Sequence, residues 1–351
     1  MLGDEREALL ARLHHIRTIQ RLGDVAGARA ALEALRPQVE RAEDVALAAE
    51  FYFIAARAAI HGPYEAALAD GRRSLDLALR IGDRYAEARA RSLVAALSGR
   101  LRNHTDRERE VKAALAAYRD VGDQAGIDGG ILNVAAWQSF CGDFEAVRQT
   151  LSELRAGARP LHALFATGIL GYADMWEGRL KSAIAKLCSA RDEAKRLKLP
   201  RYVALASLWL AEAYRLNGDA KKARRSIDVA ADNLAAFEEP DTIADVRALS
   251  ARLYATQGNR DAALADAAAV EELAAAQTIP GFAFVAWHLA VAYALLGEGP
   301  ASERCAAEAA RAFTEDAMQM SPVAVEHWSR LPWHREIIAF LSGRQPGPPN
   351  L

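Results

Sequence analysis

Apolar residues recur along most of the chain at the spacing of an α-helix, in segments that short polar turns separate. In the segment 202–216, Leu205, Leu208 and Trp209 stand at positions i, i+3 and i+4, which lie on one face of a helix. Segments of similar length and pattern follow one another from about residue 4 to residue 317. The pattern therefore predicts a chain of consecutive helices without strands.

Two interleaved sets of helix-breaking residues divide these segments. The first set is a turn that contains Gly, often followed by Asp or Asn; the second is a Gly-Asp pair or a Pro about halfway between two such turns. Gly ends a helix at little steric cost, Asp or Asn can cap the next helix, and Pro cannot continue one. Each set recurs about every 40 residues, so the repeating unit is a hairpin of two helices. The first set comprises Gly23, Gly62, Gly142, Gly178, Gly218, Gly258 and Gly297, with Arg102 at the one missing position.

The segments assemble into eight predicted hairpins and a short C-terminal segment. We predict an all-α, right-handed superhelical solenoid of antiparallel helix hairpins that forms a single domain over residues 1–342. The segment 322–342 is expected to cover the exposed face of the last hairpin, and residues 343–351 are expected to be a flexible tail. The hairpins are predicted near residues 4–40, 43–81, 84–121, 124–156, 162–198, 201–237, 242–276 and 282–317.

Alanine occupies 78 of the 351 positions, or 22%. Ala is the best helix former and a poor strand former, which agrees with an all-α fold. Part of the excess stands at fixed distances from the turns, where two helices must approach closely. Five positions after the turn Gly the chain has Ala28, Ala67, Ala183, Ala223 and Ala263, with Val147 once, and before the turn it has Ala55, Ala135, Gly171, Ala211, Ala251 and Ala290.

These positions resemble the pattern of the tetratricopeptide repeat (TPR) over residues 4 to about 317. That family also places a small residue five positions after the turn Gly and often Tyr four positions before it, where this chain has Tyr214, Tyr254 and Tyr293. The chain departs from the family in its period, about 40 rather than 34 residues, and in its third repeat, where Glu108 replaces the small residue. Arrays with this longer period look like the C-terminal sensor arrays of bacterial LuxR-type regulators and of ATPases joined to cyclase domains.

The resemblance implies a concave groove lined by the first helix of each hairpin, at positions 13, 10, 6 and 3 residues before the turn Gly. Carried over to this chain, these positions combine aromatic side chains with a few opposite charges. Such a surface suits a peptide or protein segment better than a polyanion. The candidate groove residues are Tyr52, Arg89, Leu132, Phe165, Tyr172, Leu208, Glu212, Arg215, Asp245, Arg252, Phe284 and Trp287.

The arginines of this groove allow two interpretations. Arg89, Arg215 and Arg252 could hold a ligand carboxylate through two parallel hydrogen bonds. Alternatively, they pair with Glu212 and Asp245 inside the groove. Two further groups are expected to be structural. His288 is predicted to be a hydrogen-bonded histidine of the core or groove, and the tryptophans of the first helices, among them Trp209, are expected mainly between helices.

The charges argue against nucleic acid as a partner. The chain has 44 Lys and Arg against 46 Asp and Glu, a formal net charge of −2, whereas a nucleic-acid-binding domain needs a basic face. Cys141, Cys188 and Cys305 lack the spacing of a disulfide framework or a zinc site, and we expect free thiols in a cytoplasmic protein. The apolar stretch 279–297 has the length of a membrane span, but it falls in register with the hairpins, so we interpret it as a repeat helix.

No catalytic or nucleotide-binding motif stands out, and we predict no catalytic residue, cofactor or metal site. The sequence therefore favours a non-enzymatic scaffold that binds a protein, a peptide or a small effector, as the regulatory or sensor array of a bacterial signalling or transcription-regulatory system. The alternative is a stand-alone intracellular receptor for a signalling peptide, similar to Gram-positive quorum-sensing receptors. An enzyme with an unusual site in the groove is the third hypothesis.

Overall fold

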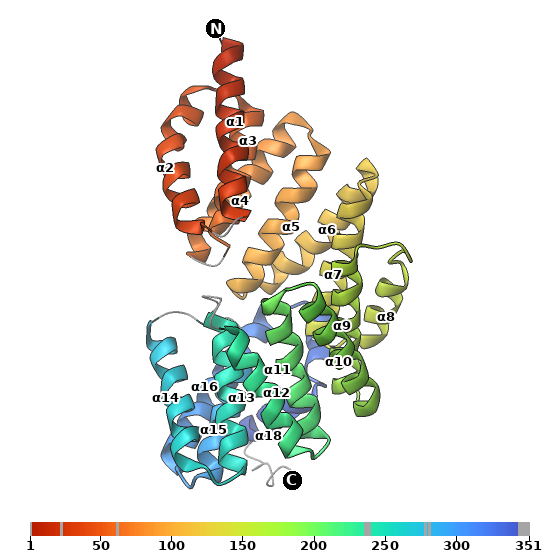
Figure 1. Cartoon of the computed structure of the whole chain (residues 1–351), viewed down its shortest axis with the longest axis vertical. Helices are drawn as coiled ribbons and strands as arrows, with labels where there is room; N and C mark the ends of the chain where they lie inside the picture. The colour runs from red at the N-terminus through yellow and green to blue at the C-terminus, as the bar shows by residue number, and fades with distance from the viewer. Residues whose placement is uncertain are drawn as a thin grey trace. The chain divides into compact units, whose positions relative to one another are not determined.

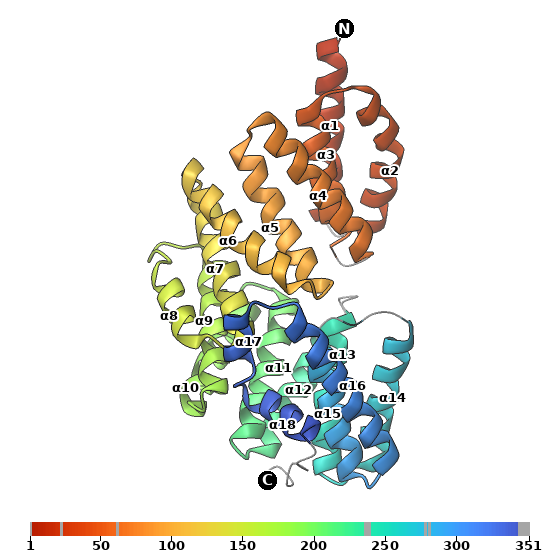
Figure 2. The same cartoon turned by 180° about the vertical axis from the view of Figure 1, so that it is seen from behind.

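The computed structural model describes residues 2–21, 24–60, 63–234, 240–276, 279 and 282–342, and every regular element in these ranges is a helix (Figure 1 and Figure 2). The predicted tail, residues 343–351, and the turn residues Gly23 and Gly62 lie outside the described residues. The helices are α1 (Leu2–Arg21), α2 (Val25–Arg41), α3 (Val45–Ala58), α4 (Tyr64–Ile81), α5 (Arg84–Arg100), α6 (His104–Val121), α7 (Gln124–Cys141), α8 (Phe144–Ser152), α9 (Pro160–Trp176), α10 (Leu180–Arg196), α11 (Pro200–Leu216), α12 (Ala220–Leu234), α13 (Pro240–Thr256), α14 (Arg260–Ala276), α15 (Phe282–Leu295), α16 (Gly299–Met318), α17 (Pro322–Trp328) and α18 (Pro332–Leu341).

Consecutive helices pair into hairpins, and the hairpins stack on their neighbours. α3 packs on α4, α5 on α6, α9 on α10, α11 on α12, α13 on α14, and α15 on α16. Contacts between α4 and α5, between α10 and α11, and between α13 and α15 join one hairpin to the next. The all-α hairpin fold predicted from the sequence is thus confirmed.

The turns explain where the helices of a hairpin end. The turn glycines take the left-handed conformation that Gly adopts without strain. At the third hairpin Arg102 takes the same conformation, with φ of 59°, so the missing Gly changes the residue and keeps the turn. Asp143 and Asp219 then cap the next helices by accepting hydrogen bonds from the backbone N–H groups of Ala146 and Lys222. The left-handed glycines of this set are Gly142, Gly178, Gly218, Gly258 and Gly297, with φ between 73° and 80°.

The small residues of the repeat lie where two helices cross. Ala67, Ala183 and Ala223 are at most 1% exposed. A Cβ added at Gly171 would lie 2.8 Å from Cγ of Leu187 on α10, so a larger residue there would push Leu187 aside. Close crossings therefore account for part of the alanine content.

The chain divides into two compact units, residues 1–134 (unit 1) and residues 135–351 (unit 2), and α7 belongs to both. The core of unit 1 is built from α1 to α5, where Leu13, Phe51 and Ile54 are fully buried. In unit 2, α11, α12 and α13 meet around Leu208 and Ile227. The single continuous array predicted over residues 1–342 concerns how the two units join, and it stays a prediction.

One element differs in detail from what the pattern predicts, since α8 ends at Ser152, four residues before the predicted position 156. The C-terminal segment 322–342 forms two short helices, α17 and α18. The apolar stretch that we interpret as a repeat helix forms α15, which packs on α13 and α16. Among the described residues, no helix is both long enough and apolar enough to cross a membrane.

Candidate functional site

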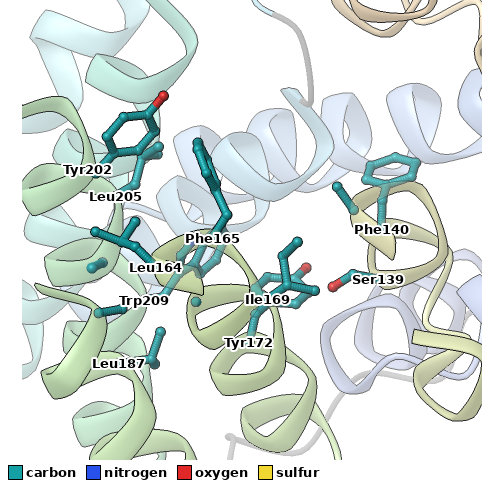
Figure 3. Close-up of a pocket in the computed structure, with 14 residues that line it drawn as sticks. Ser139, Phe140, Leu164, Phe165, Ile169, Tyr172, Leu187, Tyr202, Leu205 and Trp209 are labelled. Atoms are coloured by element: carbon teal, nitrogen blue, oxygen red, sulfur yellow. The ribbon is translucent and has the colours of Figure 1, made fainter. Parts of the chain in front are cut away.

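Unit 2 contains an apolar cavity of about 300 Å³ (Figure 3). Its walls come from the end of α7, from α9 and α11, and from α10. This volume is at the lower end of the range for ligand pockets, so it suits one large side chain or a small ligand. The lining residues are Ala136, Ser139, Phe140, Leu164, Phe165, Gly168, Ile169, Tyr172, Leu187, Ala190, Tyr202, Leu205, Ala206 and Trp209.

Aromatic rings from successive hairpins hold one another in place at this cavity. The rings of Phe165 and Tyr202 meet edge to face, with 4.6 Å between centroids, and those of Tyr172 and Trp209 do so at 4.8 Å. Such pairs contribute about 0.5–1.5 kcal/mol beyond the burial of their surface. Each pair joins α9 to α11, so the walls of the cavity are formed before any ligand arrives.

The sequence of α9 explains why one of its faces is open to the cavity. Phe165, Ile169 and Tyr172 stand at i, i+4 and i+7, on one face of the helix. Gly168 shares this lining, and no atom lies within 4 Å of a Cβ added there, so this glycine leaves space in the cavity. Gly171, in contrast, faces the close crossing with α10. The face of α9 with the large apolar residues thus lines the cavity, and the face with Gly171 packs against α10.

Buried charged residues lie on α11, α13 and α15 of the same unit. Glu212 accepts two hydrogen bonds from the Arg215 guanidinium, with N···O distances of 2.7 and 2.6 Å. Arg252 donates a hydrogen bond to Nδ1 of His288 at 3.4 Å, so the proton of the neutral imidazole resides on Nε2. Arg252 is only 5% exposed and His288 2%.

Burial and neighbouring charges set the protonation of this group. Burial by itself would raise the pKa of Glu212, but the adjacent Arg215 guanidinium outweighs it and holds that pKa at about 2. Burial lowers the pKa of His288 to about 3 and, together with the nearby charge of Arg215, that of Arg252 to about 10. At neutral pH Glu212 and Arg252 are therefore charged and His288 is neutral. None of these three pKa values lies near neutrality, where a general acid or base works best.

A chain of ring contacts connects the charged group to the cavity. The ring of Phe284 lies 4.3 Å from that of His288 and 5.8 Å from that of Trp209, which lines the cavity. Phe284 also meets the ring of Trp333 from α18, at 5.3 Å. Phe284 is therefore the link between the charged group, the cavity and the C-terminal segment.

The C-terminal segment contacts helices at both ends of unit 2. Trp287 of α15 donates its indole N–H to Glu336 of α18 at 2.7 Å. In α17 the ring of Trp328 lies 6.2 Å from that of Phe140 on α7, and Leu331 lies against Gly142 of the α7–α8 turn. A segment that only covered the last hairpin would not reach α7, so α17 and α18 also help to fix the first helices of this unit.

In unit 1, the candidate groove residues lie apart. Arg89 donates two hydrogen bonds to Glu50, at 2.9 and 3.3 Å. Tyr52 donates its hydroxyl proton to Glu40 of α2 at 3.2 Å, which turns it toward the preceding hairpin. Leu132 is buried in α7. Of these three predicted residues, Arg89 lines a cavity of unit 1.

The structure brings together some of the candidates in unit 2. Phe165 and Tyr172 line the cavity, whereas Leu208 is fully buried in the core. Asp245 is half-buried. Burial of Tyr172 raises the pKa of its hydroxyl, and the negative charge of Asp245 raises that pKa further. Sequence reasoning did not select Tyr202, because this residue stands in the first turn of α11, ahead of the groove positions of the repeat.

The three arginines of the predicted groove have different partners. Arg215 pairs with Glu212, as the second interpretation expects, whereas Arg89 pairs with Glu50, which that interpretation did not name. Arg252 is different, because among the described residues no carboxylate lies within ion-pair distance of it and its hydrogen bond goes to His288. Its charge is balanced only at longer range, by Glu212 and Glu336.

Comparison with known proteins finds relatives by structure alone. No protein-family model matches the chain, and no curated protein is similar to it in sequence at a significant level. A Rap protein complexed with competence and sporulation factor superposes with a TM-score of 0.64 at 15% identity, over 97% of this chain and 99% of that chain. The apo form of the quorum sensor NprR from B. thuringiensis gives 0.58 at 15% identity, over 95% and 87%. NprR in complex with its cognate peptide NprX gives 0.56 at 14% identity, over 97% and 99%.

These identities are too low to transfer a function, and what they show is the fold. The similarity extends over nearly the whole length of the described chain and of the Rap and NprR structures. Together with the helix pairs, the left-handed turns and the small residues at the crossings, it shows a TPR-like stack of helical hairpins.

Proposed function

We propose that this protein is a non-enzymatic receptor that binds a peptide or protein segment by inserting an apolar side chain into the cavity of unit 2. The observation that carries the proposal is the preformed aromatic cavity. Its lining includes Phe165, Gly168 and Tyr172, which stand at the repeat positions where the TPR resemblance places the groove. Pockets with aromatic walls that exclude water are where the strongest contacts of a peptide interface concentrate.

The structural relatives support a peptide as the ligand. NprR binds its cognate peptide NprX, and its structure matches this chain over nearly its full length. We therefore favour the receptor for a signalling peptide, acting in a bacterial regulatory system in the cytoplasm, over a sensor array for small effectors. The pKa values of the buried charged group, all far from neutrality, support a binding role rather than acid–base catalysis.

Two glycine substitutions test the cavity without damaging the fold. Gly168→Phe places a ring in the cavity, and Gly129→Phe on α7 is the matched control, because both glycines lie within helices and have no atom within 4 Å of an added Cβ. A random peptide library displayed on phage would be selected on the wild-type protein, and the selected peptides would be titrated by fluorescence anisotropy. We expect wild type and Gly129→Phe to bind alike and Gly168→Phe to lose binding.

Two results would reject the proposal. The first is that selection enriches no peptide above the background of an unrelated protein. The second is that the selected peptides bind Gly168→Phe as tightly as they bind the wild type, provided that thermal unfolding shows both variants to be folded. In the second case the peptide site would lie elsewhere on the chain.

A further inference from the structure

Unit 1 has a cavity of its own, about 400 Å³ in volume, whose chemistry differs from that of the cavity in unit 2. Three arginines line it, Arg17 from α1, Arg57 from α3 and Arg89 from α5. The lining has no aspartate or glutamate among the described residues. The remaining lining residues are Phe53, Ile60, Tyr85, Ser92, Leu93, Ala96 and Tyr118.

The structure holds one of these arginines firmly in place. Two hydrogen bonds fix Arg89 to Glu50, and its guanidinium carbon lies 4.0 Å from the ring centre of Phe53 and 5.6 Å from that of Tyr85. A guanidinium fixed between a carboxylate and two rings has little conformational freedom left to lose when a ligand binds. Arg89 is therefore a preorganised wall of the cavity.

Two of the three arginines in the lining share one carboxylate. Glu50 is shared, since it also lies 3.7 Å from Arg17 in addition to its contact with Arg89. Glu50 thus neutralises only one of the two positive charges of Arg17 and Arg89. Arg57 brings a third guanidinium to the wall, from a different helix.

The rest of the lining is largely apolar. Phe53, Ile60, Leu93 and Ala96 form this apolar wall, with Phe53 directly against Arg89, and Tyr85 keeps 48% of its surface exposed. A cavity that combines cationic and apolar side chains suits a molecule that has an anionic group and a small apolar or aromatic body.

We propose that this cavity binds a small phosphomonoester, with its phosphate on Arg17, Arg57 and Arg89 and its organic group on the apolar wall. A phosphate presents three strongly accepting oxygens and close to two negative charges, whereas a carboxylate presents two oxygens and one charge. Guanidinium groups from three separate helices match the phosphate better. The site is independent of the proposed peptide cavity, because the two cavities share no lining residue.

Calorimetric titration of the full-length protein at constant ionic strength tests this assignment with three probes, phenyl phosphate, inorganic phosphate and benzoate. Phenyl phosphate should bind most tightly. Benzoate should bind at least about tenfold more weakly, because a carboxylate makes fewer charge-assisted hydrogen bonds than a phosphate. Arg17→Gln and Arg57→Gln should each weaken phenyl phosphate about tenfold. Arg80→Gln on α4 is the matched control, since this exposed arginine does not line the cavity, and it should leave the affinity unchanged.

Three outcomes would overturn the assignment. These are no heat of binding with phenyl phosphate, a loss of affinity in Arg80→Gln as large as that in Arg17→Gln, and binding of benzoate as tight as that of phenyl phosphate. A melting temperature measured with and without phenyl phosphate checks the variants independently of the heat signal, and it should rise more for wild type and Arg80→Gln than for Arg17→Gln and Arg57→Gln. Phenyl phosphate should bind Gly168→Phe as tightly as it binds the wild type, because this substitution lies in the other cavity. The proposal for this cavity and the peptide proposal can therefore fail independently of each other.

Discussion

The two cavities show how one repeat produces two kinds of site. At positions 13, 10 and 6 before the turn, the fifth hairpin carries Phe165, Gly168 and Tyr172, and these residues line the apolar cavity of unit 2. At the same positions before Arg102, the third hairpin carries Arg89, Ser92 and Ala96, which line the cationic cavity of unit 1. The repeat therefore determines where a cavity forms, and only a few side chains per hairpin determine what it can bind.

The charged groups of the two units differ in the same way. In unit 1, Glu50 and Arg89 keep 19% and 18% of their side-chain surface exposed and are partly solvated. In unit 2, Glu212 is 1% exposed, and its charge is held beside Arg215 and within range of Arg252. When one charge of the buried group is removed, water cannot solvate the opposite charge that remains. The stability of unit 2 should therefore be more sensitive to such a change than that of unit 1.

The largest expected effect comes from removing the buried carboxylate. Glu212→Gln leaves Arg215 without its partner and removes one of the two negative charges that act on Arg252, and it should lower the free energy of unfolding by roughly 3 kcal/mol. Glu50→Gln, the matched change in unit 1, should cost only about 1 kcal/mol, because its arginines remain partly solvated. Urea unfolding followed by circular dichroism measures both. Equal losses would show that the two charged groups do not differ in the way we describe.

The next effect tests what the two units share. Ala67→Leu in unit 1 and Ala223→Leu in unit 2 both enlarge a fully buried residue at a helix crossing. Each should cost about 1–3 kcal/mol, because extra methylene groups in a packed crossing force neighbouring helices apart. Thermal unfolding compares them. If either variant melts at the wild-type temperature, the repeat register is wrong in that unit.

A smaller effect appears with pH. His288 and His334 are buried, and burial lowers the pKa of each to about 3, below the ordinary value of 6.5. Between pH 6.5 and about pH 3 the unfolded chain binds protons that the native protein does not. The free energy of unfolding should therefore decrease as the pH falls through this range. The slope should reach at most about 1.4 kcal/mol per pH unit for each histidine. His288→Gln should make the decline shallower. A profile that is as steep in His288→Gln as in wild type would exclude His288 as a source.

The smallest effect is a difference in sign between two arginines. Arg252→Met removes a buried cation that contacts no carboxylate, so stability should stay the same or rise by about 1 kcal/mol. Arg89→Met removes a paired cation and should cost about 1 kcal/mol, since Glu50 then keeps only its longer contact with Arg17. Denaturant unfolding of both variants decides the point. A marked loss for Arg252→Met would mean that this residue supports the fold in a way that its contacts do not explain.

The sequence predicts the repeat well because local rules govern it. The turn glycines, the capping Asp143 and Asp219 and the small residue at Ala223 each follow from the geometry of one or two neighbouring helices. The same register selects Phe165 and Tyr172, which line the cavity. These predictions need no knowledge of distant parts of the chain.

The remaining features depend on neighbours far away in sequence. The pair of Arg215 and Glu212 is local to α11, but the contact of Arg252 with a histidine depends on which side chains α13 and α15 bring together. The contacts of Phe284 and Trp287 with α18 depend on the path of the C-terminal segment, which no periodic pattern describes. The cationic cavity of unit 1 needs three helices at once, so residue-by-residue assignment finds Arg89 and misses its neighbours.

Hydrogen–deuterium exchange with a selected peptide tests most directly whether the apolar cavity, and not the cationic one, takes the peptide. The account predicts slower exchange in the part of α7 within unit 2, in α9 and in α11, which form the cavity, and no change in α1, α3 and α5. Protection confined to α1, α3 and α5, or binding without protection of α9 and α11, would contradict it.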